Sequence, residues 1–354
     1  MDDATRALRA TCTRFIHGDG LVRPADQLAA IDPDIRADTY GDGGVVADLE
    51  RQVAELLGKP AAVFLPSGTM AQGATLRVHA DRRKSRTVAW HPTCHLDLYE
   101  MQAHTRLHQL IGRPVGRRDR LFTLADLEQI AEPLAALLIE LPQREIGGQL
   151  PAWDDLVAQV DWARDRGAAV HLDGARLWEA SAGYNCSPAE IAALFDTGYV
   201  SFYKGIGALP GCCVVGSTED VEQVREWRRR LGGTLYGLWP LAASAHKLLA
   251  ERLAEMPARL AHARAIAAEL AAIDGVRVLP DPPQVPMMHL VLSVSAEQFS
   301  INARRLAEDH GVWTWAEAAP TDDPGMVRCE LTVGRGTLQL SPSEVTQAIA
   351  ALVG

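Results

Sequence analysis

Residues 168–176, AAVHLDGAR, decide the fold class of this 354-residue chain. The stretch is an apolar run that ends in the polar residues Asp173 and Arg176. It follows WDDLVAQVDWARDRG (153–167), an amphipathic helix pattern that Gly167 terminates. A helix that leads into a buried strand is typical of a βαβ unit. We therefore expect Asp173 at the carboxyl end of a strand, the edge at which open α/β sheets bind ligands.

Other apolar segments extend this pattern on both sides of 168–176. DLERQVAELLGK (48–59) has helical periodicity and ends near Gly58, a plausible residue for a helix C-terminus. Short apolar runs typical of buried strands are AAVFLP (61–66), TVAWHP (87–92), ALLIELP (136–142), GYVSFYKGIG (198–207) and CCVVGS (212–217). Strands that alternate with helices predict a mainly parallel sheet between helices.

The character of the chain changes at about residue 219. Long alanine-rich helix patterns lead into the proline-rich break LPDPPQVPM (279–287). Short strands and a helix near 296–310 follow, which indicates a small α+β domain. We predict two domains: an N-terminal segment with a large ligand-binding domain over residues 1–240, and a small C-terminal domain over 241–354.

Composition excludes several classes of protein. A formal net charge of −10 argues against a nucleic-acid surface. No run of about 18 apolar residues is present, so we expect no membrane association, and the polar N-terminus lacks a signal-peptide core. The six cysteines contain no CxxC pair, which favours reduced thiols over disulfides. These features predict a cytoplasmic α/β enzyme that acts on a small molecule.

The segment PSGTMAQ (66–72) is the first candidate site, because it joins an expected strand to an expected helix. A helix N-terminus presents free N–H groups and positive partial charge, and glycine lets the backbone approach a ligand closely. Ser67, Gly68 and Thr69 are therefore candidates for binding a phosphate group. An ordinary capped helix is the alternative explanation.

The second and third candidates are Asp173 and Lys204. A near-buried aspartate needs a cationic or donor partner, and a structural Asp173–Arg176 pair is the alternative to a ligand site. The chain has only four lysines, and Lys204 alone lies between bulky residues and a glycine-rich run, in SFYKGIGALPGCCVVG (201–216). A partly desolvated lysine has a lowered pKa and becomes a nucleophile, whereas a surface-loop lysine is the alternative.

These three candidates together match the needs of pyridoxal 5′-phosphate. The helix N-terminus would hold the phosphate, Asp173 would keep the pyridine nitrogen protonated, and Lys204 would hold the aldehyde. The glycines after Lys204 would leave room beside the cofactor ring. Histidines spaced four apart also occur, at His91 with His95 and at 104 with 108, but no further ligand completes either pair, so we predict no metal site.

Four segments resemble the low-specificity threonine aldolases, a beta-eliminating lyase family of fold type I (aspartate-aminotransferase-like) pyridoxal-phosphate enzymes. YGDGGVVADLE (40–50) is similar to the family's YGDDPTVNALQ, and PSGTMAQ to its PTGTQAN. HLDGARLW (171–178) is similar to HVDGARIF, and FYKGIGALPGCCVVG (202–216) to LSKGLGTPVGSLLVG. The resemblance covers the chain from about residue 15 onward. It implies a mainly parallel seven-stranded sheet between helices, with a small C-terminal α+β domain.

The resemblance implies roles for the residues that hold the cofactor. Lys204 corresponds to the Schiff-base lysine and Asp173 to the partner of the pyridine nitrogen. Gly68 and Thr69 correspond to phosphate-binding residues, and Arg176 is a further candidate for cofactor binding. His95, in HPTCHLDLYE (91–100), falls where the family has a histidine stacked on the cofactor ring.

On the substrate side, the resemblance implies that Arg176 and Arg328 hold the substrate carboxylate. Here the sequence departs from the family. The serine of the N-terminal RSDTVTRP segment is Gly18, the serine before the lysine is Tyr203, and the ENTHN-type segment is ELPQREIGGQLP (140–151), without histidine.

The GGGMRQ segment of the family, with its arginine, is GGTLYG here, around Tyr236. We consider Gln143, Arg144 and Tyr236 as sources of replacement contacts to the substrate.

The resemblance implies an aldolase that cleaves or forms the Cα–Cβ bond of a β-hydroxy-α-amino acid such as threonine, giving glycine and an aldehyde. Asp173 and Lys204 would act with His95, which is the candidate base unless water mediates the proton transfer. Beta-elimination, aminotransfer and racemisation on another amino acid are the enzymatic alternatives, and a non-catalytic protein is the third. The family also implies a homodimer or homotetramer with shared active sites, to which Tyr40 would contribute.

Overall fold

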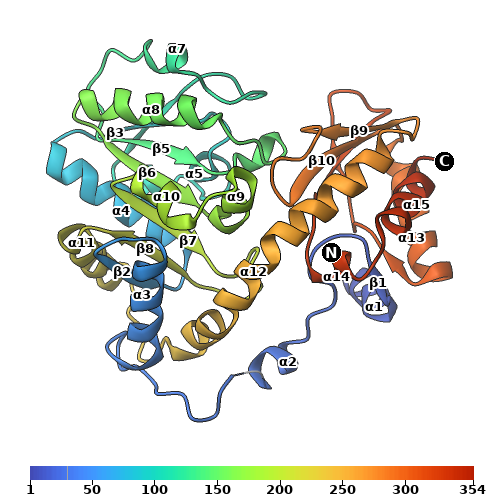
Figure 1. Ribbon diagram of the computed structural model, residues 1–354, viewed down its shortest axis with the longest axis horizontal. Coiled ribbons are helices and arrows are strands. Elements are labelled where there is room, and N and C mark those ends of the chain that lie inside the picture. The colour runs from blue at the N-terminus through green and yellow to red at the C-terminus, as the bar shows by residue number, and fades with distance from the viewer. Residues whose placement is uncertain (30) are drawn as a thin grey trace. The chain divides into compact units, whose positions relative to one another are not determined.

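The computed structural model describes residues 1–29 and 31–354, which form two compact units (Figure 1). The large unit comprises residues 25–144 and 150–254. The small unit comprises residues 1–24, 145–149 and 255–354. None of the helices in the described part of the chain combines the length and apolar character that a membrane span requires. All six cysteines are free thiols, as predicted.

A seven-stranded sheet forms the centre of the large unit, with the strand order β2-β8-β7-β6-β5-β3-β4. Its strands are β2 (Ala61–Leu65), β3 (Thr87–Trp90), β4 (Ile111–Pro114), β5 (Ala136–Glu140), β6 (Ala169–Gly174), β7 (Thr197–Ser201) and β8 (Cys212–Gly216). All neighbouring pairs from β4 to β7 are parallel, and only β8 runs antiparallel to its neighbours β7 and β2. The predicted mainly parallel, seven-stranded sheet is therefore confirmed.

The register of three central strands places polar residues side by side at one edge of the sheet. Asp173 pairs with Glu140 on β5 and with Tyr199 on β7. Paired residues on adjacent strands direct their side chains to the same face. Three short apolar segments that are far apart in the sequence thus bring a row of two carboxyl groups and a phenol to one place.

The large unit also contains helices, several of which contact its sheet. They are α2 (Pro24–Ala29), α3 (Gly44–Leu56), α4 (Gly68–Arg83), α5 (His95–Leu98), α6 (Ala103–Arg106), α7 (Leu124–Leu127), α8 (Trp153–Asp165), α9 (Leu177–Tyr184), α10 (Pro188–Ala193), α11 (Thr218–Arg230) and the first half of α12 (Trp239–Leu270); a 3₁₀ turn spans Arg144–Ile146. The α4 helix packs across strands β2 and β5 to β8. Gly58 and Gly167 have φ values of +59° and +73°, so both predicted helix ends are confirmed.

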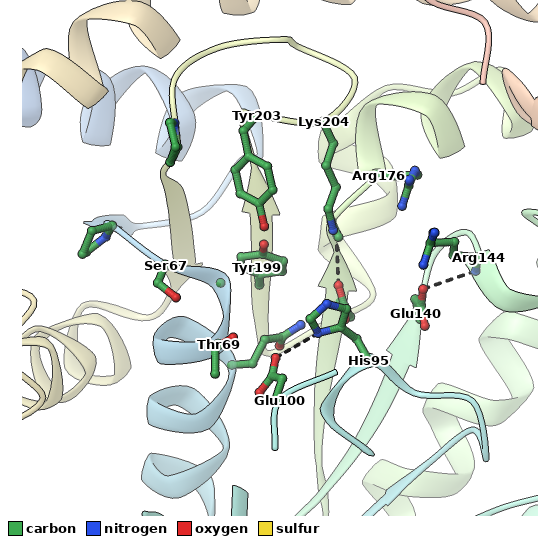
Figure 2. Close-up of a pocket in the computed structure, with 16 residues that line it drawn as sticks. Ser67, Thr69, His95, Glu100, Glu140, Arg144, Arg176, Tyr199, Tyr203 and Lys204 are labelled. Atoms are coloured by element: carbon green, nitrogen blue, oxygen red, sulfur yellow. Dashed lines mark hydrogen bonds and ion pairs between the residues drawn. The ribbon is translucent and has the colours of Figure 1, made fainter. Parts of the chain in front are cut away.

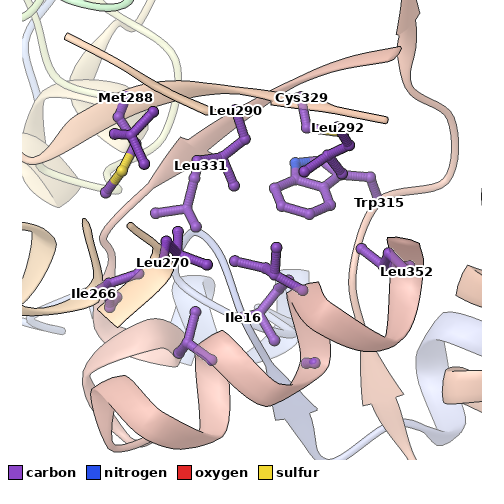
Figure 3. Packing of buried hydrophobic residues seen from close by; sticks show 14 of the residues in the cluster. Ile16, Ile266, Leu270, Met288, Leu290, Leu292, Trp315, Cys329, Leu331 and Leu352 are labelled. Atoms are coloured by element: carbon purple, nitrogen blue, oxygen red, sulfur yellow. The ribbon is translucent and has the colours of Figure 1, made fainter. Parts of the chain in front are cut away.

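The small unit is built on a four-stranded antiparallel sheet, in the order β12-β13-β10-β9. Its strands are β9 (Val276–Leu279), β10 (Met287–Leu292), β12 (Ala319–Pro320) and β13 (Val327–Thr332). Its helices include α13 (Ala296–His310), α14 (Arg335–Leu338) and α15 (Pro342–Val353). Figure 3 shows the core of this unit, in which Ile266, Leu290 and Trp315 pack together.

The first 24 residues lie in the small unit, whereas the sequence analysis placed them with the large domain. Helix α1 (Asp3–Thr11) packs on α13, and β1 (Arg14–Phe15) pairs in parallel with β11 (Val312–Trp313). Ile16 is fully buried in the small-unit core, where its side chain contributes roughly 1.5–3 kcal/mol of hydrophobic stabilisation. This long-range pairing leaves no local signal, which explains why the segment was assigned to the other domain.

Candidate active site

A cavity of about 280 Å³ opens at the strand edge that carries Glu140, Asp173 and Tyr199 (Figure 2). All of its lining residues belong to the large unit. They are Pro66, Ser67, Gly68, Thr69, Gln72, His95, Glu100, Glu140, Arg144, Asp173, Ala175, Arg176, Tyr199, Tyr203, Lys204 and Pro210. The cavity therefore brings together the three candidate sites that the sequence analysis identified.

The first wall of the cavity is the N-terminus of α4. Ser67 is its N-cap residue, with φ −143° and ψ 136°, and its side chain makes no capping hydrogen bond to the helix. A Cβ atom at Gly68 would strike the hydroxyl of Tyr199. Only glycine lets this helix end lie against Tyr199, which leaves the first N–H groups of α4 directed at the cavity.

Asp173 lies at the base of the cavity, at the end of β6, and is buried. One of its carboxylate oxygens, Oδ1, accepts a hydrogen bond of 3.1 Å from the backbone N–H of Ala175. Burial raises the pKa of Asp173, and the nearby Lys204 ammonium opposes that increase. A buried carboxylate at this position gains from a cationic partner, which is the property expected of a group that pairs with a protonated ring nitrogen.

Lys204 follows β7, and its side chain points into the cavity beside Arg176 (Figure 2). Burial lowers its pKa, and repulsion from Arg176 adds to this effect. Asp173, Glu140 and Glu179 act in the opposite direction. Because the lowered pKa makes the neutral amine more accessible, Lys204 is suited to nucleophilic attack on an aldehyde.

Two tyrosines form the wall between Lys204 and α4. The hydroxyls of Tyr199 and Tyr203 are hydrogen-bonded to each other, and the Lys204 Nζ lies 5.7 Å from the centre of the Tyr203 ring. Burial raises the pKa of both phenols, so both stay neutral. Tyr203 stands where the family has a serine. It is hydrogen-bonded to Tyr199, and the Tyr199 hydroxyl lies close to the backbone of Gly68.

Glu140 is a cavity residue that the sequence analysis did not single out. It ends β5 beside Asp173, and burial together with the Asp173 charge raises its pKa to about 8. Its carboxyl group accepts hydrogen bonds from the backbone N–H of Arg144 at 3.2 Å and from Nε2 of Gln143 at 2.8 Å. Glu140 is therefore largely neutral at pH 7. The site then does not carry a second negative charge next to Asp173.

His95 and Glu100 also line the cavity (Figure 2). The Nδ1 atom of His95, at the start of α5, lies 3.0 Å from Oε1 of Glu100. The Glu100 side chain is 2% exposed, whereas that of His95 is 41% exposed. The ring of Tyr99 lies 5.2 Å from the His95 ring, centre to centre.

Two arginines supply positive charge to the same cavity. Arg176 precedes α9, and Arg144 begins the short 3₁₀ turn after β5. The Arg144 guanidinium lies 5.9 Å from the centre of the Tyr99 ring, a distance at which a cation–π interaction is favourable. Both arginines line the cavity together with Lys204.

Three predicted site residues do not line the cavity. Gln143 is buried behind it and donates to Glu140. Tyr236 is 74% exposed and contacts Tyr40 edge to face, with the Tyr40 N–H bonded to the Tyr236 carbonyl at 2.9 Å. Arg328 lies on β13 in the small unit, where it pairs in register with Val291.

The glycines after Lys204 have another explanation than the one expected. A Cβ atom at Gly205 would strike the carboxylate of Glu179, and one at Gly211 would strike the ring of Phe64. These two glycines thus accommodate neighbouring side chains, and the expectation that the glycines leave room beside a ligand stays a prediction.

Four cavity residues with polar side chains were not identified as candidates in the sequence analysis: Gln72, Glu100, Glu140 and Tyr199. Glu140 had a usable signal, because a charged residue at the end of an apolar strand is the same feature that identified Asp173. Gln72 lies one turn into α4, and its Oε1 atom is 2.7 Å from Nε2 of the buried His171. Glu100 and Tyr199 are placed by the turn after α5 and by strand register, which the sequence alone does not reveal.

The residues of the cavity fit the predicted cofactor. The glycine at the α4 N-terminus provides a phosphate cradle that a Cβ atom would fill, Asp173 is a buried carboxylate, and Lys204 is a buried amine. His95 adds an imidazole ring to the cavity wall. Across residues 1–29 and 31–354, no group of three or more His, Cys, Asp or Glu side chains is arranged to hold a metal ion.

Comparisons with known proteins agree with this arrangement. A model of the beta-eliminating lyase family matches residues 25–293. A protein of Exiguobacterium sp. 255-15, provisionally described as an aromatic amino acid beta-eliminating lyase/threonine aldolase, is 36% identical with a TM-score of 0.92, and the match covers 98% of each chain.

A second structure, from Listeria monocytogenes, is provisionally described as an L-allo-threonine aldolase and is 34% identical, with a TM-score of 0.92 over 98% of this chain and 97% of that one. Low-specificity L-threonine aldolase 1 of Arabidopsis thaliana is 26% identical over 309 residues, 84% of this chain and 86% of that protein. The predicted aspartate-aminotransferase-like fold type I of pyridoxal-phosphate enzymes is confirmed.

Proposed function

The chain belongs to the beta-eliminating lyase family, and on that premise we propose that it is a pyridoxal-phosphate-dependent aldolase. It cleaves, or forms, the Cα–Cβ bond of a β-hydroxy-α-amino acid such as threonine, with glycine and an aldehyde as the products. The observation that carries the proposal is the meeting of Lys204, Asp173 and the α4 N-terminus around one cavity. The threonine aldolases among the similar proteins supply the reaction type.

Five residues are proposed to hold the cofactor. Ser67, Gly68 and Thr69 bind its phosphate at the positive end of α4, Asp173 pairs with the pyridine nitrogen, and Lys204 binds the aldehyde carbon. When bound, pyridoxal phosphate withdraws electrons from the Cα atom of an amino acid and so makes its bonds easier to break. His95 is proposed to lie against one face of the ring.

Substrate recognition is assigned to the positively charged side of the cavity. Arg176 binds the substrate carboxylate, as the resemblance implies, and Arg144 contributes a second positive charge. Fixing the carboxylate orients the Cα–Cβ bond relative to the ring, and orientation of this kind accounts for a large part of enzymatic rate enhancement. Gln143 acts indirectly, through its hydrogen bond to Glu140. Roles for Arg328 and Tyr236 in substrate binding stay predictions.

Cleavage also requires that a base take the proton of the β-hydroxyl group. We assign this role to His95, the one histidine among the described residues that line the cavity. Glu140 already accepts hydrogen bonds from the Gln143 amide and the Arg144 N–H, so we do not assign the role of base to it. The neutral Glu140 instead keeps the negative charge of the site concentrated on Asp173.

The experiment that tests the function follows all products of one incubation. Purified protein with bound pyridoxal phosphate is supplied with threonine, allo-threonine, phenylserine and serine, and aldehyde, glycine, ammonia and keto acid are measured. Aldehyde and glycine in equal amounts support the aldolase. Ammonia and keto acid without glycine would show a β-eliminating lyase and contradict the proposal, as would an amino-group transfer or a racemised substrate.

We further propose a cytoplasmic homodimer or homotetramer. Six free cysteines suit a reducing compartment. The exposed Tyr40 and Tyr236 rings, which contact each other edge to face, form an aromatic patch of the kind enriched at protein interfaces. Light scattering of the purified protein gives the oligomeric state, and a monomeric mass at micromolar concentration would contradict the proposal.

A further inference from the structure

The cavity holds a histidine–carboxylate pair whose role the proposed function leaves open. His95 has two ring nitrogens, and only one of them, Nδ1, contacts Glu100, at 3.0 Å. Glu100 is buried, with its side chain 2% exposed, while His95 reaches the cavity with a side chain that is 41% exposed. The carboxylate of the pair is therefore buried, whereas the imidazole ring is accessible from the cavity (Figure 2).

The chemistry of the two groups determines the direction of this hydrogen bond. An ionised carboxylate only accepts, so the Nδ1–H of His95 donates to Glu100. In the neutral imidazole the other nitrogen, Nε2, then carries the lone pair. A base in this cavity needs that arrangement, because the proton to be removed belongs to a substrate in the cavity, not to a group behind it.

No second histidine lines the cavity in the described residues to share the task. Where the family carries its ENTHN-type histidine, this chain has Gln143, whose amide is bonded to Glu140 and, at 3.3 Å, to the hydroxyl of Thr93. An amide does not act as a base near neutral pH. The proton transfer in this chain thus depends on the His95 ring and on whatever fixes its tautomer.

We propose that Glu100 is a positioning residue that holds the Nδ1 proton of His95 and presents Nε2 as the acceptor of the substrate β-hydroxyl proton. The proposal rests on the proposed function. The proton moves from the substrate oxygen to Nε2, the electrons of the O–H bond form the aldehyde C=O bond, and the Cα–Cβ bond breaks with its electron pair left on Cα, where the bound cofactor would withdraw it. Glu100 stabilises the imidazolium that results and does not itself take a proton.

Other charged and titratable groups also face the His95 ring. The Tyr99 ring contacts it, and Asp173 on β6 interacts with it electrostatically. Across the cavity lie Glu140, Arg144, Arg176, Tyr199, Tyr203 and Lys204. Each of these groups is retained in a Glu100 variant, so a difference between variant and wild type isolates the Glu100 carboxylate.

The decisive variants are Glu100→Gln and Glu100→Ala in the cofactor-loaded enzyme. The glutamine oxygen can still accept from Nδ1–H but carries no negative charge, whereas alanine removes the acceptor and leaves the tautomer of the ring unfixed. We expect kcat to fall about 100-fold or more in Glu100→Ala, the scale of a lost general base, and less in Glu100→Gln. A merely structural role predicts an acid limb of kcat that stays at its wild-type position in both variants.

The pH profile gives a second reading. The free imidazole is the active form, so activity is lost as pH falls and the ring becomes protonated. Removal of the carboxylate destabilises the imidazolium, and the acid limb of kcat in Glu100→Ala is expected at lower pH than in wild type. An acid limb at the wild-type position would overturn the proposal.

Asp97→Asn is the matched control. Asp97 lies on α5, the helix that begins with His95, and its Oδ1 atom is 3.7 Å from Nε2 of His104. Neither Asp97 nor His104 lines the cavity. The Asp97→Asn substitution keeps the shape of the side chain, and its carbonyl can still accept from Nε1 of Trp90. We expect the acid limb of this variant to match wild type, and a shift equal to that of Glu100→Ala would overturn the proposal.

Nitrogen NMR of the enzyme labelled with ¹⁵N-histidine tests the tautomer without any activity measurement. A His95→Gln variant identifies the His95 signals among the eleven histidines. Protonated Nδ1 with unprotonated Nε2 supports the proposal, and the opposite tautomer overturns it. If the enzyme cleaves no β-hydroxy amino acid, the proposed function fails separately, while the NMR result still decides whether Glu100 fixes the ring.

Discussion

The two sides of the active-site cavity are built in different ways. The side that we propose to hold the cofactor consists of Ser67, Gly68, Thr69, Asp173 and Lys204, which lie at the ends of regular elements: the α4 N-terminus, the end of β6 and the residues after β7. The substrate side consists of His95, Glu100, Glu140, Arg144 and Arg176. Apart from Glu140, which ends β5, these residues lie in or beside short helices and turns.

The difference teaches which part of the site is free to vary. A residue at a strand end is fixed by the register of the whole sheet, so its position tolerates little change without loss of the fold. A residue on a short turn is fixed by a few local hydrogen bonds, such as those that Glu140 accepts from Gln143 and Arg144. We therefore expect cofactor-side changes to abolish chemistry and substrate-side changes to alter which amino acid is used.

The largest effect is expected for Lys204→Ala. Without the amine the aldehyde of the cofactor has no covalent partner, so activity should fall roughly 1,000-fold or more, and the visible band of the lysine-bound cofactor should disappear. Absorbance spectra and borohydride labelling of the purified variant check this. Lys247→Ala, on α12, is the control. A borohydride-stable adduct at another lysine in Lys204→Ala would contradict the assignment.

Asp173→Asn should have the next largest effect. The amide cannot hold the ring nitrogen in its protonated state, and the loss of one preorganised electrostatic partner costs about 100- to 1,000-fold in kcat. The cofactor should still bind, because Lys204 and the phosphate cradle are unchanged. Kinetics and cofactor titration separate the two effects. Wild-type kcat in Asp173→Asn would show that the carboxylate is structural.

Arg176→Gln should affect substrate rather than cofactor. Charge-assisted hydrogen bonds are worth about 1.5–3 kcal/mol, so kcat/KM should fall about 10- to 100-fold for every amino acid, with an unchanged cofactor spectrum. The paired variant Arg144→Gln should give a smaller loss that differs between threonine and phenylserine. Equal losses for both substrates in Arg144→Gln would place its guanidinium on the carboxylate as well.

The same contrast explains what the sequence could and could not predict. Apolar runs bounded by polar residues predicted the strands and the strand-end position of Asp173, because burial on both faces of a parallel sheet demands such runs. Tyr199 was missed because its place beside Asp173 depends on register. Glu100 was missed because a turn after α5 returns it to His95, and the N-terminal segment because β1 pairs with a strand about 300 residues away.

Gly68→Ala should weaken cofactor binding without removing a group that takes part in the chemistry. The added Cβ atom meets the Tyr199 hydroxyl, and overpacking of this kind costs about 1–3 kcal/mol, so the affinity for pyridoxal phosphate should fall about tenfold. Tyr199→Phe removes the obstructing oxygen, and the double variant should regain part of the loss. Strictly additive losses in the cofactor titration would show that the two residues do not meet.

The last prediction concerns Glu140 and the stability of the cofactor-free protein, with no expected loss of activity. Its pKa is about 8 in the folded state, above the ordinary value of 4.5, so between these pH values the folded protein binds more protons than the unfolded chain. The free energy of unfolding therefore falls as pH rises through this window, by up to about 1.4 kcal/mol per pH unit. Glu140→Gln removes this dependence. The free energy of unfolding of the variant, relative to that of wild type, should therefore be higher at pH 8 than at pH 6.

Urea unfolding of wild type and Glu140→Gln at pH 6 and pH 8 measures the difference. Glu190→Gln is the control, because the capping contacts to Ser187 lower the pKa of this exposed carboxyl. Its contribution is complete above about pH 4.5 and is lost only at lower pH, so this variant should shift stability equally at both pH values. If Glu140→Gln also changes the free energy of unfolding equally at pH 6 and pH 8, Glu140 is ionised at neutral pH. The cavity then carries a second negative charge beside Asp173.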